Sequence, residues 1–159
     1  MNQQIVVDIS KQTLMLYQYD EPVRSYGVST AKNGPGEIAG SECTPRGKHI
    51  IRAKIGANQA PNTVFVGRRP TGEIYSTELR AQYPKRDWIL TRILWLSGAE
   101  KGFNRLGRVD TMRRYIYIHG TPDTEPMGEP RSHGCIRMRN ADIIDLFERV
   151  PVYTPVFIE

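Results

Sequence analysis

Arg114-Tyr115-Ile116-Tyr117-Ile118-His119 is the clearest strand signal in the chain. Its β-branched and aromatic residues alternate, as they do in a strand that turns one face to a hydrophobic core. Gly120 and Thr121 follow, and a loop over residues 120–134 leads to Ser132-His133-Gly134-Cys135-Ile136-Arg137-Met138. The segment 114–119 is therefore predicted to be a strand that ends at His119.

More strands are predicted before this segment. Turn residues cluster at 10–12, 33–36 and 44–47, which separates apolar stretches of strand length. The predicted strands cover residues 5–9, 14–17, 23–30 and 48–55. Residues 57–86 contain many Pro, Gly, Asn and Arg residues and predict irregular structure with short strands, a candidate flap. Residues 87–96 are apolar enough for either a buried strand or a short helix.

A helix and a last strand are predicted after it. Ile143, Ile144, Leu146, Phe147 and Val150 recur at helical spacing. Asn140 is predicted to cap this helix, Asp142 suits the positive end of its dipole, and Pro151 ends it. Residues 152–158 predict a closing strand. Residues 1–159 are thus expected to form a single, mainly β domain, a sandwich or barrel with one C-terminal helix and short helical or irregular insertions.

Composition limits the partners and the compartment. The formal net charge is +5, but the basic residues are scattered and match no nucleic-acid motif, so we expect small anionic partners and no nucleic acid. No apolar stretch is long enough to cross a bilayer, which predicts no membrane partner. Residues 1–10 lack signal-peptide features, so we expect a cytoplasmic protein, or a periplasmic one if a leader was removed. The oligomeric state is not indicated.

His119 and Cys135 are the candidate catalytic residues. They lie 16 positions apart, and a strand that ends at His119 followed by a loop would bring both side chains to one sheet edge. A thiol is a good nucleophile only as thiolate, and an imidazole or nearby cations lower its pKa. Arg131, Arg137 and Arg139 would supply such a field. Gly134 would let the backbone approach a substrate closely and leave N–H groups for an oxyanion.

Two other interpretations of these residues stay open on spacing alone. A lone cysteine is more often a small buried hydrophobe than a nucleophile. Zinc is a minor alternative, since Cys43, His119, His133 and Cys135 would form a ligand set, yet no CxxC or HxxxH spacing supports it. We therefore expect no metal and no cofactor. With two cysteines the chain has too few for a disulfide framework.

The segment 132–137, preceded by a strand-borne histidine, resembles the signature of the L,D-transpeptidase catalytic domain family (YkuD type). The likeness covers nearly the whole chain and includes residues 5–8, 14–17, 29–30, 44–47, 95–98, 115–121 and 154–158. It implies the fold of that family and an acyl-enzyme reaction on peptidoglycan stem tetrapeptides.

The resemblance also implies roles for single residues. Cys135 would attack the carbonyl of the third stem residue, expel the terminal D-alanine and hold the donor as a thioester, with His119 as the base. The main-chain carbonyl of Gly120 would orient the His119 ring. Backbone N–H groups of His133, Gly134 and Cys135 would bind the oxyanion, and Arg137 would place a substrate carboxylate. Ser132 would order the loop through hydrogen bonds, and His133 need not be a base.

The acceptor is less determined than the donor. Because residues 1–10 show no export signal, we expect water as the acceptor, so that a cytoplasmic L,D-carboxypeptidase would trim soluble muropeptides during murein recycling. The alternatives are a cross-linking L,D-transpeptidase that joins two stem peptides and an inactive peptidoglycan-peptide binding module.

Four further residues carry weaker expectations. Cys43 is expected to be an inert core thiol, and a low pKa is expected to make Cys135 the more reactive of the two towards alkylation below neutral pH. His49 is expected to lie in a strand and to have no catalytic role. Tyr115 and Tyr117 alternate with core residues, so they are expected on the surface or in a cleft.

Overall fold

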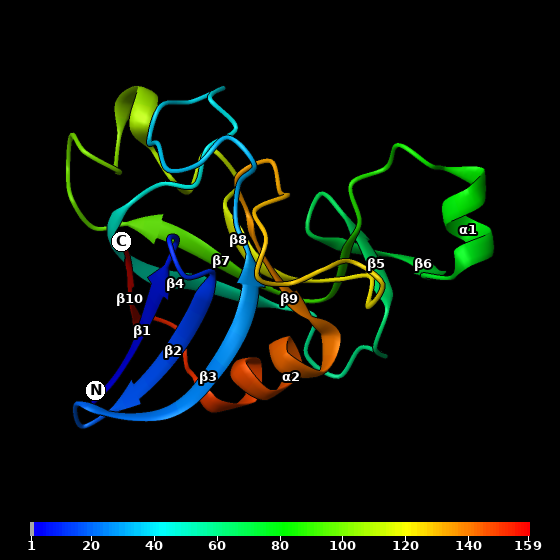
Figure 1. Ribbon diagram of the computed structural model, residues 1–159, viewed down its shortest axis with the longest axis horizontal. Coiled ribbons are helices and arrows are strands. Elements are labelled where there is room, and N and C mark those ends of the chain that lie inside the picture. Colours follow the sequence, from blue (N-terminus) through cyan, green and yellow to red (C-terminus); the bar gives the residue numbers. More distant parts are fainter. Residues whose placement is uncertain (1) are drawn as a thin grey trace.

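Strands dominate the computed structural model, which describes residues 2–159 (Figure 1). The elements in chain order are β1 (Gln3–Asp8), β2 (Thr13–Gln18), β3 (Glu21–Ser29), β4 (Gly47–Ile55), β5 (Thr63–Val66), β6 (Arg69–Ile74), α1 (Thr77–Gln82), β7 (Ile89–Gly98), the 3-10 helix η1 (Gly107–Val109), β8 (Tyr117–Thr121), β9 (Ile136–Arg139), α2 (Asn140–Arg149) and β10 (Pro155–Ile158). The mainly β class with one C-terminal helix is confirmed.

The strands form one sheet that closes on itself. Its order is β4-β10-β1-β2-β3-β9-β8-β7-β5-β6, and β4 also pairs with β7, which completes a ring from β4 through β10 and β3 to β7. The two ends of the chain meet in this ring, because β1 pairs in parallel with β10. β5 and β6 continue from β7 outside the ring, and Figure 1 shows them, with α1, projecting to one side of the barrel.

The core fills the interior of the ring. Alternate residues of the strands point inward, as the sequence pattern predicted: Ile5 and Val7 in β1 and Leu14 and Leu16 in β2 are at most 1% exposed. Helix α2 packs its apolar face against β7, β8 and β9. The helix therefore supports β8, which contains His119, and β9, which begins directly after Cys135.

The strand ends differ from the predicted ones by up to three residues, and the central strand is displaced along the chain. The strand expected over 114–119 begins at Tyr117 and runs on to Thr121. Tyr115 instead has a φ of 57°, and Arg114 N–H donates to the Asp110 carbonyl, so a turn occupies these positions. The ambiguous segment 87–96 is a strand, β7, over Ile89–Gly98.

Asn140 does not cap α2, contrary to prediction. Arg139 is the N-cap residue and makes no side-chain cap hydrogen bond. The Asn140 side chain is buried, accepts a hydrogen bond from Thr91 Oγ1 at 2.5 Å, and donates from Nδ2 to Asn62 Oδ1 at 2.9 Å and to Asp123 Oδ1 at 3.2 Å. A buried amide must satisfy its own donors and acceptor, and this requirement outweighs its capping preference.

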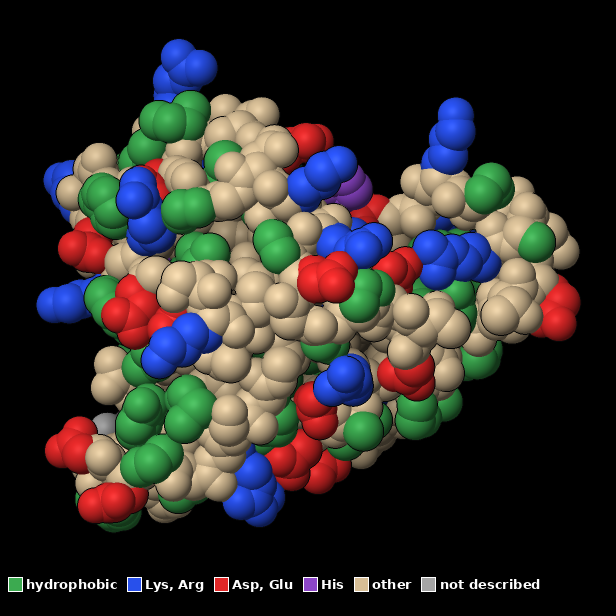
Figure 2. Space-filling view, viewed as in Figure 1, with side chains coloured by type: hydrophobic (Ala, Val, Ile, Leu, Met, Phe, Trp, Pro, Cys, Tyr) green, Lys and Arg blue, Asp and Glu red, His purple; other side chains and the backbone are tan. Residues whose placement is uncertain are grey.

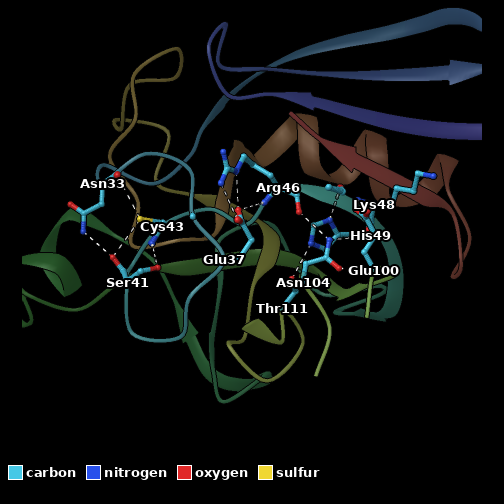
Figure 3. Close-up of polar contacts among 12 residues, drawn as sticks. Asn33, Glu37, Ser41, Cys43, Arg46, Lys48, His49, Glu100, Asn104 and Thr111 are labelled. Atoms are coloured by element: carbon cyan, nitrogen blue, oxygen red, sulfur yellow. Dashed lines mark hydrogen bonds and ion pairs between the residues drawn. The ribbon is translucent and has the colours of Figure 1, made fainter. Parts of the chain in front are cut away.

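A polar network ties the loops over 31–46 and 99–113 to β4 (Figure 3). Arg46 binds Glu37 through Nε and Nη2 at 2.9 and 3.0 Å. Asn104 Nδ2 donates to the carbonyls of Arg46 and Lys48, both at 3.0 Å. These hydrogen bonds hold the loop over 31–46 against the barrel. The same loop contacts the turn before Cys135 through Thr44.

His49 lies in β4, as predicted, and is buried in this network. Its Nδ1 is 3.0 Å from the Gly47 carbonyl and its Nε2 is 2.9 Å from Thr111 Oγ1 (Figure 3). Because a carbonyl only accepts, Nδ1 carries the proton and Nε2 accepts from the threonine hydroxyl. Burial lowers the pKa of His49 to about 4. The ring is thus neutral in the folded protein at neutral pH.

Acid should therefore destabilise the fold through His49. The unfolded chain protonates this histidine near its ordinary pKa, whereas the folded state resists protonation until about pH 4. The penalty is absent above the unfolded pKa, grows as the pH falls and is complete near pH 4, at roughly 3 kcal/mol. Urea unfolding at pH 7 and pH 4 should show this loss in the wild type and a smaller one in His49→Gln. Equal losses in both proteins would exclude His49 as a source.

Candidate active site

Two adjacent parallel strands bring His119 and Cys135 to one pocket. In the β8–β9 register His119 lies opposite Arg137, and Cys135 immediately precedes β9. The Tyr117 N–H donates to Cys135 Sγ at 3.3 Å, so the cysteine sits next to β8 two residues before His119. Both side chains line a cavity of about 430 Å³. The predicted meeting of the two residues is present, but it lies between two central strands and not at a sheet edge.

Gly120 orients the His119 ring. His119 Nδ1 is 2.6 Å from the Gly120 carbonyl, the contact that the resemblance implied. The carbonyl requires the proton on Nδ1, which leaves the lone pair of Nε2 as the basic site. Burial lowers the pKa of His119, so the imidazole is neutral at neutral pH. A Cβ at Gly120 would lie 2.5 Å from Asn140 Oδ1 and 2.6 Å from the Leu90 carbonyl, so the close packing here requires glycine.

The Cys135 thiol is protonated in the resting site, contrary to the expected low pKa. Burial raises its pKa to about 12, and this outweighs the lowering by the Tyr117 N–H and by Arg137 and Arg114. Of the three arginines expected to supply positive field, Arg131 is exposed and binds Glu129 at 2.9 Å, and Arg139 is exposed. Desolvation of the sulfur therefore dominates its electrostatics.

Alkylation should follow this pKa. In Cys43→Ala, the iodoacetamide reaction of Cys135 should be slow at pH 7 and accelerate about tenfold per pH unit through the alkaline range, because the thiolate fraction grows in that way below the pKa. Mass spectrometry of samples quenched in time measures the rate. The Cys135→Ala protein reports the labelling of Cys43 separately. A rate that levels off below pH 8 would instead show a stable thiolate–imidazolium pair.

The turn before Cys135 is held from both sides. Ser132 Oγ donates to the Cys135 carbonyl at 2.5 Å and accepts from the Gly134 N–H at 3.2 Å, so Ser132 orders the loop, as expected. Thr44 Oγ1, from the loop over 31–46, donates to the Gly134 carbonyl at 2.9 Å. Gly134 has a φ of 134°, and a Cβ there would meet Cys43 O at 3.2 Å. The predicted oxyanion role of the Gly134 N–H is weakened, because Ser132 already engages it.

Arg137 and His133 stand on the same side of the pocket. Arg137 is 12% exposed, and its Nη2 lies 3.2 Å from Asp87 Oδ1. His133 is 61% exposed, with Nδ1 3.9 Å from Asp87 Oδ2. Both line the cavity with Cys135 and His119. Of the two histidines in the pocket wall, His119 is therefore the buried one and His133 the exposed one.

Sequence reasoning missed two parts of the pocket wall, Arg68 and Asp87. Arg68 lies at the tip of the β5–β6 hairpin, its guanidinium 4.7 Å from the Trp95 ring centroid, and its Nη1 donates to Tyr117 Oη at 3.0 Å. Gly67 and Arg68 fall within the segment expected to form a flap, and the Gly-Arg turn was the available signal. Tyr117 is buried beside Cys135, whereas Tyr115 is 54% exposed at the rim.

Cys43 is not the core thiol that was expected. It is half-buried, and its Sγ lies 3.6 Å from the carbonyls of both Asn33 and Ser41 (Figure 3). Its place in a polar loop, bounded by turn residues, explains the difference. Among residues 2–159, no three His, Cys, Asp or Glu side chains are grouped so as to bind a metal ion. The helices within the same range are all too short or too polar to cross a membrane.

The fold and the site define a class: a closed β-sheet with a buried histidine on one strand and a cysteine directly before the neighbouring parallel strand. Comparison with known proteins gives the family. The family model of the L,D-transpeptidase catalytic domain matches residues 2–158, and the chain therefore belongs to that family.

Individual relatives agree with this assignment. The chain is 28% identical to YkuD of Bacillus licheniformis over 154 residues, 97% of this chain and 64% of that protein. A shorter match to YbiS of Escherichia coli is 54% identical over 43 residues, 27% of this chain and 14% of that protein. The chain thus spans less than two thirds of these relatives.

Solved structures share the fold. L,D-transpeptidase 3 from Mycobacterium tuberculosis, in complex with a faropenem-derived adduct, superposes with a TM-score of 0.61 at 16% identity, over 99% of this chain and 61% of that one. An L,D-transpeptidase from Mycobacterium smegmatis gives a TM-score of 0.59 at 17% identity, over 99% and 58%.

Proposed function

We propose that the protein is a cysteine acyltransferase that acts on peptidoglycan stem tetrapeptides and cleaves the bond before the terminal D-alanine. One observation carries the proposal: Cys135 and a histidine whose Nδ1 is held by a main-chain carbonyl line the same pocket. Family membership supports the substrate class. The basic lining of the pocket, with Arg68, Arg114 and Arg137, suits a donor that carries several carboxylates.

Acylation begins from a neutral thiol and a neutral imidazole. As Cys135 Sγ attacks the carbonyl carbon of the third stem residue, its proton passes to His119 Nε2, so no thiolate has to persist beforehand. The N–H groups of His133 and Cys135 are the proposed donors to the oxyanion. The tetrahedral intermediate collapses, the C–N bond breaks, and His119 returns the proton to the amine of D-alanine. A thioester on Cys135 remains.

We propose water as the acceptor. His119 Nε2 removes a proton from water, the hydroxide oxygen attacks the thioester carbonyl, and the Cys135 sulfur leaves and is protonated, which releases the tripeptide. An acceptor amine reaches the pocket mainly as a cation, and the lining there holds three arginines against one carboxylate, Asp87. This field disfavours a cationic acceptor relative to neutral water. The hydrolytic reaction would suit soluble muropeptides in the cytoplasm, a location that fractionation of the producing cells would test.

Cross-linking is the second candidate. A groove of about 720 Å³ adjoins the pocket through His133 and Arg137 and would offer space for a second stem peptide. Its two carboxylates, Glu125 and Glu129, are already paired with Arg80 and Arg131. Mass spectrometry separates the two reactions. Purified enzyme should convert a disaccharide tetrapeptide to the tripeptide, with dimers below a few per cent even when acceptor stems are added. Abundant dimers would establish cross-linking, and an unchanged substrate would favour a binding module.

A further inference from the structure

A second cavity, of about 130 Å³, lies beside the catalytic pocket. It is bounded by the end of α1 and the loop after it, residues 80–88, and by residues of β8 and β9. We call it the Trp88 cavity, after the side chain that lines it together with Arg80, Lys85, Arg86 and Arg137. It shares Asp87, His133 and Arg137 with the catalytic pocket, so the two spaces are neighbours.

Unpaired donors coincide with this cavity. Over residues 2–159, two buried side-chain nitrogens have no hydrogen-bond partner, Trp88 Nε1 and Arg137 Nε, and both residues line the Trp88 cavity. Trp88 is 5% exposed. Indole and guanidinium N–H groups donate and never accept, so the group that would satisfy both must bring acceptor oxygens. Buried donors in native proteins rarely lack a hydrogen-bond partner. Two such donors on residues of one cavity therefore point to a ligand there.

The charge of the lining indicates an anion. Four cations, Arg80, Lys85, Arg86 and Arg137, line the cavity against two carboxylates, Asp87 and Glu125. Arg80 is paired with Glu125 and Arg86 is paired with Glu73, both at 2.8 Å. Arg137 is held by Asp87 through Nη2 alone, at 3.2 Å. Figure 2 shows Lys and Arg side chains interspersed with Asp and Glu side chains at the neck between the barrel and the projecting lobe of α1.

We propose that the Trp88 cavity binds a carboxylate of the peptide that occupies the catalytic pocket, with Trp88 and Arg137 as its donors. The identity of that peptide rests on the proposed function. Asp87 is 46% exposed, and it can turn into water while the ligand carboxylate takes its place on Arg137. Binding also requires the groups that cover the two unpaired nitrogens to shift, because both nitrogens are shielded from solvent. A carboxylate matches the plane of a guanidinium and accepts two bonds at once.

The two tryptophans make a test with an internal control. Trp95 Nε1 donates to the Met112 carbonyl at 3.1 Å and should not respond to an anion, whereas Trp88 Nε1 is free to do so. In ¹H–¹⁵N spectra of Cys135→Ala, acetate should shift the Trp88 indole signal downfield and saturably while Trp95 stays in place. Inorganic phosphate is the second arm. Phosphate that binds tenfold tighter than acetate, or no saturable shift with either anion, would overturn the carboxylate assignment.

Matched variants separate a site from general basic charge. Arg137→Gln should weaken acetate binding about tenfold, whereas Arg139→Gln, the same charge change at an exposed residue of the same strand, should change it by less than twofold. Asp87→Asn should tighten binding, because it removes the competing carboxylate. Equal weakening in the two arginine variants would overturn the proposal.

Turnover of the wild type, measured alongside, separates this inference from the proposed function. A tetrapeptide with a free terminal carboxylate and its amide should also be titrated, with the Trp88 signal as the readout. Hydrolysis without any shift of the Trp88 indole signal would contradict only the cavity assignment. A saturable Trp88 response to acetate in a protein without turnover would sink only the proposed reaction.

Discussion

Cys135→Ala should abolish turnover, with a loss of at least about a thousandfold, because the covalent route needs the sulfur that lines the pocket. The fold should survive, because Cys135 Sγ makes hydrogen bonds only with backbone groups of Tyr115 and Tyr117, and the residue is partly exposed at the edge of an apolar cluster. Release of D-alanine and tripeptide, followed by mass spectrometry, measures the loss. A thermal unfolding midpoint within a few degrees of the wild type would confirm that the protein is folded.

Cys43→Ala is the matched control for this experiment. Cys43 also holds a free thiol, but its sulfur faces the carbonyls of Asn33 and Ser41 and does not line the pocket. It should retain activity within about twofold of the wild type. Residual turnover by Cys135→Ala at more than a few per cent would contradict the acyl-enzyme mechanism.

His119→Ala should reduce kcat about a hundredfold or more, the usual effect of losing a general base. Because the His119 ring is buried, the variant His119→Gln should be measured beside His119→Ala. Glutamine fills more of the space than alanine and still provides an N–H donor toward the Gly120 carbonyl. Both should be inactive if proton transfer is what is lost. In the wild type, the acidic limb of the kcat profile should fall below pH 6.5, because burial lowers the pKa of His119 and keeps Nε2 unprotonated there.

His133→Ala tests the assignment of the base. Its ring is mostly exposed and 3.9 Å from Asp87, so the substitution should cost less than about tenfold. A larger loss in His133→Ala than in His119→Ala would reverse the two roles.

Local patterns were sufficient for most of the secondary structure. Alternation in β1 and β2 and the helical spacing of Ile143 and Leu146 reflect burial on one face, which any single sequence displays. The segment around Cys135 was recognisable for a different reason, because His119, Gly120 and residues 132–137 lie close together in the sequence. What failed were expectations that depend on surroundings, such as the cap at Asn140 and the burial of Cys43.

The sequence alone determined a mainly β protein with a histidine and a cysteine separated by one loop. Only the tertiary structure decided their electrostatics and their neighbours. The pKa of Cys135 depends on how far the fold removes water from the sulfur. Arginines that are near in sequence do not predict this burial. Arg68, Asp87 and Trp88 reach the site through a hairpin and a loop far away in sequence, and such contacts arise only when the sheet closes and places them there.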